Sequence, residues 1–255
     1  MSRTPVVARE SSLSPTVLVI EHEADAPIAR FGPWLTDAGV RLDVRRPWTG
    51  DQLPSDLRAD GLVVLGGAMS AGDDDAVPWL ATTRSLLAQA VVGEVPTFAI
   101  CLGAQLLAVA TGGRVEVGVV GPELGICPIE LTAESASDRL FSSLRPPVLA
   151  PQWHYDAIAA LPPDTVLLAT ADRYEVQAFR IGTAAWGVQF HPEIDGAVMA
   201  AWVANEHSDD FSPEVLSHLA EEVETAQPSL TASWRGVAER FAELVGAHAR
   251  SNPLP

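Results

Sequence analysis

Short apolar runs alternate with segments of helical periodicity over the first 110 residues. Runs rich in Val, Leu and Ile predict buried strands at 16–20, 40–44, 61–65 and 95–100. Apolar residues three and four positions apart predict helices over 27–38, 77–92 and 102–110. Continuous apolar strands that alternate with helices are typical of a parallel sheet covered on both faces.

The pattern changes after residue 114. Short β-rich segments separated by Pro and Gly predict antiparallel or mixed strands that extend the sheet, at 126–131, 166–170, 176–181 and 184–190. The rest of the chain is mostly helical in pattern, over about 196–206, 213–225 and 229–249. We predict a three-layer α/β/α fold with a mixed sheet, divided into an N-terminal leader (1–15), one α/β domain (16–205) and a helical C-terminal extension (206–255).

Composition narrows the class of protein. The 33 Asp and Glu residues against 16 Lys and Arg give a net charge of −17, which disfavours binding to nucleic acids or anionic membranes. Two cysteines do not suggest a disulfide-built fold and suit a reducing compartment. The sequence has neither a secretory signal nor an apolar run of about 18 residues, so we expect a cytoplasmic protein.

Two short segments carry the candidate chemistry. Ala99–Gln105 places Cys101 where a strand turns into a helix, whose N-terminus favours a thiolate. A second strand ends in Gln-Phe-His-Pro-Glu, which supplies His191 with Glu193 two residues later. A thiolate that attacks an acyl carbon, an imidazole that transfers protons and a carboxylate that orients the imidazole form a Cys-His-Glu nucleophilic site.

Simpler interpretations exist for the same residues. A cysteine on an apolar strand is often a buried structural residue, but the His-x-Glu at a second strand end favours the catalytic interpretation for Cys101. His191 and Glu193 point to one face of a strand, as metal ligands do, yet no third ligand stands at a useful spacing. We therefore expect no metal and no organic cofactor.

Together with Gly66–Ser70 (GGAMS), these segments resemble the class I, or triad, glutamine amidotransferases over about residues 16–203. The similarity is closest to stand-alone GMP-synthase-like members, which share an acidic loop, here 73–75, and a W-H-x-D segment, here 153–156. The resemblance implies a flavodoxin-like three-layer α/β/α sandwich.

The resemblance also implies a role for each matched residue. Cys101 is the expected nucleophile, His191 the general base and then acid, and Glu193 the carboxylate that orients the imidazole. The backbone N–H groups of Gly67 and Leu102 are expected to form an oxyanion hole, where one donor is typically worth about 10²–10³ in rate. Expected substrate contacts come from Gly66, Gln105 and His154.

The chain departs from the family pattern at three places. Ala99 stands where Gly is frequent, a small change that we expect to leave the turn intact. Ala68 replaces the proline of the common Gly-Gly-Pro, which predicts a more flexible oxyanion loop. Residues 121–126 (GPELGI) replace the usual Lys-Glu-Ile-Gly-Trp, so substrate contacts from this segment are in doubt.

Two further features each have two interpretations. His154 either helps to select the substrate at the mouth of the site or is a packed structural histidine. Asp73–Asp75 either screen anionic substrates or begin the next helix, where negative charge suits the helix dipole.

The predicted activity is that of a glutamine amidotransferase or glutaminase, which hydrolyses the side-chain amide of glutamine through a glutamyl thioester. About 60 residues follow Glu193, which we expect to be too few for a synthetase domain, so a separate synthetase or acceptor subunit is the candidate partner. The alternatives are a stand-alone γ-glutamyl peptidase or hydrolase that acts on small γ-glutamyl compounds, and a non-catalytic regulatory subunit. Neither nucleic acid nor a membrane is an expected partner.

Overall fold

The computed structural model describes residues 14–207 and 211–252, and within them nine strands form one mixed sheet in the order β2-β1-β3-β4-β11-β10-β9-β6-β7. A separate two-stranded ladder pairs β5 with β8. The strands are β1 (Thr16–Ile20), β2 (Arg41–Arg45), β3 (Gly61–Val64), β4 (Thr97–Ile100), β5 (Arg114–Val117), β6 (Glu123–Leu131), β7 (Val148–His154), β8 (Asp156–Ala160), β9 (Thr165–Thr170), β10 (Ala178–Ile181) and β11 (Ala185–Val188).

The sheet has a parallel half and an antiparallel half, as the sequence predicts. β2, β1, β3, β4 and β11 run parallel to one another, whereas β10, β9, β6 and β7 continue the sheet in antiparallel pairs. β3, β4 and β11 are buried along their whole length, which is the expected state of strands covered on both faces. The predicted α/β/α sandwich is confirmed.

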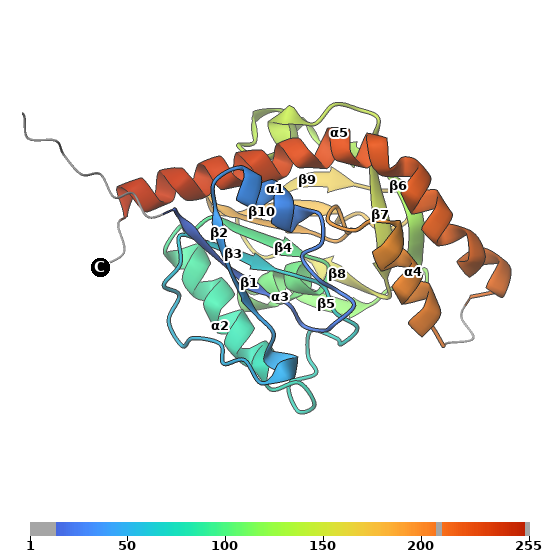
Figure 1. The fold of residues 1–255 in the computed structure, drawn as a ribbon, viewed down its shortest axis with the longest axis horizontal. Coiled ribbons are helices and arrows are strands. Elements are labelled where there is room, and N and C mark those ends of the chain that lie inside the picture. Colours follow the sequence, from blue (N-terminus) through green and yellow to red (C-terminus); the bar gives the residue numbers. More distant parts are fainter. Residues whose placement is uncertain (1–13, 208–210, 253–255) are drawn as a thin grey trace, which may run out of the picture.

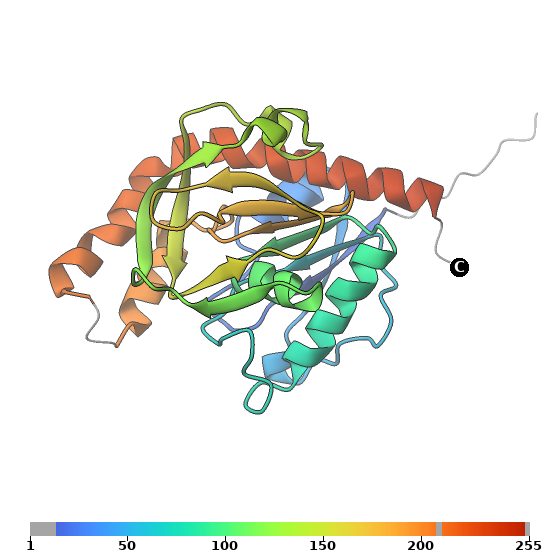
Figure 2. The same cartoon turned by 180° about the vertical axis from the view of Figure 1, so that it is seen from behind.

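Helices cover both faces of this sheet. Figures 1 and 2 show α1 and α5 on one face and α2 and α3 on the opposite face. The helices are α1 (Phe31–Asp37), α2 (Trp79–Val92), α3 (Leu102–Ala110), α4 (Gly196–Asn205) and α5 (Pro213–Ser251), with short 3₁₀ helices at Pro47–Thr49, Ala133–Ser137 and Phe141–Ser143. Two apolar cores result, one on each side of the sheet.

The C-terminal helix differs most from its prediction, because α5 is one helix of 39 residues rather than two. Pro228 lies inside it, and a proline in a helix interior costs about 3 kcal/mol. Large buried side chains stand on both sides of the proline, including Val223 before it and Leu230 and Trp234 after it. Burying each one is worth about 1.5–3 kcal/mol, so their packing outweighs the cost of Pro228, and Figure 1 shows α5 bending along its length.

Two other differences have local causes. α1 begins at Phe31 instead of residue 27, because Ala29 has φ +40°, outside the right-handed helical region. Strands β5, β7 and β8 were not predicted. β7 contains Pro151, which weakens a strand pattern, but β7 is the outermost strand of the sheet, where a proline is tolerated.

The proposed division of the chain stays a prediction. Residues 1–13 of the leader lie outside the described residues. α5 supplies buried apolar side chains to the same core as β1 and β4, so it is packed as a part of the sandwich.

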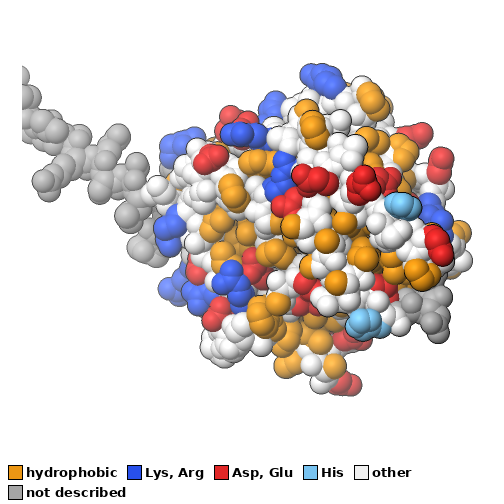
Figure 3. Space-filling view, turned by 45° about the vertical axis from the view of Figure 1, so that its right-hand side comes forward, with side chains coloured by type: hydrophobic (Ala, Val, Ile, Leu, Met, Phe, Trp, Pro, Cys, Tyr) orange, Lys and Arg blue, Asp and Glu red, His pale blue; other side chains and the backbone are white. Residues whose placement is uncertain are grey.

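No helix in the described part of the chain is long and apolar enough to span a membrane. Figure 3 shows acidic and apolar side chains intermixed over one face of the molecule.

Candidate active site

Cys101 lies in the turn between β4 and α3. Its backbone has φ +50° and ψ −110°, a left-handed conformation that costs a residue other than glycine about 1–3 kcal/mol. Next to it, Gly103 permits α3 to approach β3, since a Cβ there would lie 2.2 Å from the carbonyl oxygen of Val64. The strained turn holds the thiol at the carboxyl end of the parallel strands and at the N-terminus of α3.

His191 and Glu193 follow β11, the strand beside β4. Val188 pairs with Ile100 in this parallel register, and the Cys101 N–H donates to the Val188 carbonyl at 2.8 Å. His191 Nδ1 lies 2.8 Å from Glu193 Oε1, and both side chains are buried. Because neighbouring parallel strands end at the same edge, the sheet brings residues 90 positions apart into one site.

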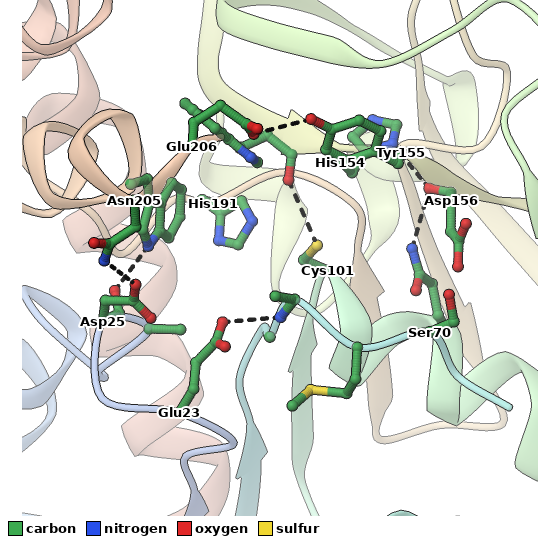
Figure 4. Close-up of a pocket in the computed structure, with 17 residues that line it drawn as sticks. Glu23, Asp25, Ser70, Cys101, His154, Tyr155, Asp156, His191, Asn205 and Glu206 are labelled. Carbon is green, nitrogen blue, oxygen red and sulfur yellow. Dashed lines mark hydrogen bonds between the residues drawn. The ribbon is translucent and has the colours of Figure 1, made fainter. Parts of the chain in front are cut away.

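The electrostatics of this site favour a charged imidazole. Burial by itself lowers the pKa of His191, but the negative charges of Glu193 and of the Cys101 thiolate, with hydrogen bonds to both, raise the pKa above its usual range. Figure 4 shows the His191 ring beside the Cys101 sulfur. An imidazolium held between a thiolate and a carboxylate is suited to donate a proton to a leaving group.

The turn after β3 packs closely against His191 and Cys101. A Cβ at Gly66 would lie 2.8 Å from His191 Cε1 and 3.5 Å from Cys101 Cβ, so no larger residue fits. Gly67 lines the cavity in front of the thiol. Leu102 is the first residue of α3, and its N–H therefore has no acceptor within the helix. Both proposed oxyanion donors thus belong to segments that adjoin Cys101.

Two glutamines lie near the thiol, one in contact with its sulfur and the other bonded to the first. Gln189 Nε2 lies 3.7 Å from Cys101 Sγ, and Gln189 Oε1 accepts from Gln105 Nε2 at 3.4 Å. Gln105 Nε2 also donates to the carbonyl of Asp156 at 3.1 Å. Gln105 therefore lies in the site as expected. Gln189 stands within the Gln-Phe-His-Pro-Glu motif, but the sequence alone assigned it no role.

These residues open into a cavity of about 290 Å³ (Figure 4). Four carboxylate residues line it, and none of the described lining residues is Lys or Arg. The lining residues are Glu23, Asp25, Ala26, Gly67, Ala68, Met69, Ser70, Cys101, Gln105, Trp153, His154, Tyr155, Asp156, His191, Trp202, Asn205 and Glu206.

His154 lines the cavity but is also fully bonded within the protein. Its Nδ1 lies 2.9 Å from the Asp156 carbonyl oxygen and its Nε2 3.0 Å from Glu123 Oε2. Glu123 in turn accepts from Gln177 at 2.9 Å. This bonding favours the structural interpretation of His154. The divergent segment 121–126 contributes to it, because the contacts of Glu123 in that segment hold the histidine and Gln177 in place.

Two side chains of the acidic loop bond to groups within or close to the loop. Asp73 accepts from the Ser70 N–H at 2.7 Å, and Asp74 pairs with Arg84 of α2. Neither aspartate lines the cavity. The loop is therefore a surface loop rather than a screen for anions, but it does not begin the next helix as expected, because α2 starts at Trp79 and has no acidic residue in its first turn. Within residues 14–207 and 211–252, no cluster of three His, Cys, Asp or Glu side chains could hold a metal ion.

The model of the family described as "Glutamine amidotransferase class-I" matches residues 34–208 of the chain. The chain belongs to this family. A glutamine-hydrolyzing GMP synthase subunit from Halobacterium salinarum is 32% identical over 157 residues, which span 61% of this chain and 76% of that protein. Gamma-glutamyl peptidase 5 of Arabidopsis thaliana is 31% identical over 178 residues, 68% of each chain.

Solved structures of amidotransferases have the same fold. A glutamine amidotransferase from Thermotoga maritima superposes with a TM-score of 0.80 at 27% identity and covers 91% of this chain and 99% of its own. One from Methylobacillus flagellatus has a TM-score of 0.78 at 26% identity and covers 93% and 96%. The recognised family and the expected flavodoxin-like architecture are both confirmed.

Trp202 and Glu23 are among the cavity residues of this amidotransferase that were not identified as site residues from sequence. The ring centroid of Trp202 lies 4.7 Å from that of His191, with the two ring planes at 68° to each other. Its Nε1 donates to the Asp25 carbonyl at 2.8 Å. Glu23 accepts from the Ala68 N–H at 2.9 Å. No spacing rule links Glu23 to Ala68 or α4 to His191, so only the folded arrangement reveals these contacts.

Proposed function

We propose that this amidotransferase hydrolyses the side-chain amide of L-glutamine through a thioester on Cys101. The observation that carries the proposal is that a strained Cys101 and His191 line the same cavity, while the buried Glu193 holds the imidazole of His191. Backbone strain at a non-glycine residue next to a charged histidine raises the free energy of the folded state. Such strain is concentrated at functional sites.

The proposed steps use residues of this chain only. The Cys101 thiolate attacks the amide carbon, and the N–H groups of Gly67 and Leu102 hold the oxyanion. His191 then protonates the nitrogen, and ammonia leaves as the thioester forms. Water, deprotonated by His191, attacks the thioester and releases glutamate. Glu193 keeps the imidazole oriented and stabilises its charge throughout.

A stand-alone γ-glutamyl peptidase is the second candidate, supported by the similarity to the Arabidopsis peptidase. The charge of the cavity favours glutamine instead. Glu23, Asp25, Asp156 and Glu206 line it. Glutamine releases ammonia, whereas a γ-glutamyl dipeptide releases an amino acid whose carboxylate these side chains repel. We infer further that the ammonia is used by a separate protein, because relatives of this chain are named as one subunit of a GMP synthase.

The test is glutamate release by the purified chain from L-glutamine and, in parallel, from γ-glutamyl dipeptides, with Cys101→Ala as the control. Turnover of glutamine that exceeds dipeptide turnover and disappears in Cys101→Ala is the expected result. Faster dipeptide hydrolysis would replace the proposal with the peptidase. An unreactive Cys101 would leave a non-catalytic, regulatory role for the chain.

A further inference from the structure

The turn that carries the proposed oxyanion donor is tied to the protein by one side chain. The Ala68 N–H donates to Glu23 Oε1 at 2.9 Å, as the dashed line in Figure 4 shows. Glu23 comes from the loop after β1, a strand next to β3 in the sheet. The peptide unit that follows Gly67 is therefore held by a residue outside its own turn.

Packing and conformational freedom conflict at Gly67. A Cβ there would lie 2.5 Å from Met69 Sδ and 3.1 Å from His22 Cβ and Leu102 Cδ2, so a larger residue would have to displace the Met69 side chain. Glycine restrains its own φ and ψ angles very little. If the peptide between Gly67 and Ala68 rotated, its carbonyl would take the place of its N–H, and the changed ψ angle of Gly67 would alter the path of the turn that carries the Gly67 N–H. An external hydrogen bond to Ala68 prevents this rotation.

The setting of Glu23 shows how much this bond matters to the carboxylate. Burial raises the pKa of Glu23, and the charge of Asp25 raises it further. The Ala68 N–H and the charge of His191 act in the opposite direction. The loop amide is thus one of the two groups that stabilise the ionised form of Glu23 at the edge of the cavity.

We propose that Glu23 is a positioning residue that fixes the turn 66–68, so that the Gly67 N–H stays directed at the oxygen of the acyl group under attack. The inference rests on the proposed function, because an oxyanion forms only if Cys101 attacks a carbonyl. Glu23 acts through the backbone of Ala68 and needs no contact with the substrate. The hydrogen bond restrains the backbone at position 68, as a proline ring there would do by fixing φ.

The test compares Glu23→Ala with Glu23→Gln, whose amide oxygen still accepts from Ala68. For Glu23→Ala we expect kcat to fall about 10- to 100-fold with KM nearly unchanged, somewhat less than the loss of a whole oxyanion donor. For Glu23→Gln we expect kcat within about threefold of the parent, since the acceptor remains. Thermal melting of both variants checks that they fold.

A proline at position 68 gives the sharper comparison. Ala68→Pro removes the N–H and fixes φ, so Glu23→Ala should have little further effect when combined with it. Additive losses in the double variant, or equal losses in Glu23→Gln and Glu23→Ala, would overturn the positioning role and assign Glu23 to charge. A rise of kcat in Glu23→Ala would overturn it as well, because Glu23 would then be blocking the donor.

A second readout separates this inference from the proposed function. The chloromethyl ketone analogue of glutamine alkylates Cys101: the thiolate displaces chloride from the methylene carbon while the ketone oxygen occupies the position of the acyl oxygen, and the inactivation rate requires no glutamine turnover. A slower rate in Glu23→Ala but not in Glu23→Gln supports the positioning role, even if the parent proves not to hydrolyse glutamine. Equal inactivation rates in all three proteins would overturn it, even if glutamine is hydrolysed.

Discussion

Within the described part of the chain two buried histidines pair with a carboxylate, and of the two only His191 also has the thiol of Cys101 beside its ring. His191 Nδ1 is 2.8 Å from Glu193, and His154 Nε2 is 3.0 Å from Glu123. Both histidines are 3% exposed, so neither burial nor a carboxylate partner distinguishes them.

The difference lies in the second ring nitrogen. His154 directs its Nδ1 to the carbonyl of Asp156, so both of its nitrogens are bound to the protein framework. His191 instead has its other contact with Cys101, the proposed nucleophile. A buried His–Glu pair is therefore structural when the fold uses both nitrogens, and is available for proton transfer when one nitrogen faces a reactive group.

Removing the thiol tests the proposed reactive pair most directly. Cys101→Ala should lower turnover about 10⁴-fold or more, because no group remains to form the thioester. The free energy of unfolding should change by only about 1–2 kcal/mol, since alanine keeps the Cβ of the strained turn. Glutamate release and urea denaturation measure the two quantities, and turnover close to that of the parent would refute the mechanism.

Removing the charge of the partner should have the next largest effect. Glu193→Gln should lower kcat about 10²- to 10⁴-fold, less than the loss of the thiol. Without the carboxylate charge, a main cause that raises the pKa of His191 is lost, so this pKa falls and less imidazolium is present at neutral pH. The pH dependence of kcat therefore shifts to lower pH on its alkaline side. An unchanged pH profile would show that Glu193 does not act through His191.

The two cysteines allow the same comparison without mutating a histidine. Cys127 lies in β6 near Glu123, and burial, with the charges of Glu123 and Glu222, raises its pKa to about 11. Cys101 has the imidazolium of His191 beside it instead. We expect iodoacetamide to alkylate Cys101 about 10- to 100-fold faster near neutral pH. Mass spectrometry of digested protein gives both rates, and equal rates would contradict the assigned charge of His191.

Disrupting the second pair should affect folding more than catalysis. His154→Gln loses the bond to Glu123 in a buried network, and we expect the free energy of unfolding to fall by about 1–3 kcal/mol. kcat should stay within about tenfold of the parent. Urea denaturation and steady-state kinetics check this, with His191→Gln as the matched substitution. A large rise in KM with unchanged stability would restore the role in substrate selection.

Much of the architecture was predictable from sequence because the parallel strands are continuous apolar runs bounded by glycines. Cys101 and His191 were identified because each stands just beyond the end of such a strand, Cys101 directly after β4 and His191 three residues after β11. The register that brings them together depends on β11 lying next to β4, which no local pattern encodes. Glu23 and Trp202 entered the site through contacts between distant segments. The continuity of α5 through Pro228 was missed, because local helix rules do not include the packing that compensates for proline.

The order of synthesis gives α5 a further consequence. Every strand of the sheet precedes this helix in the chain, so the part of the sheet face that α5 covers stays exposed while the ribosome is making α5. At typical elongation rates the 39 residues take about 2–8 s to be added. During that interval the nascent protein exposes apolar surface. Chaperones can bind this surface before α5 packs onto the sheet.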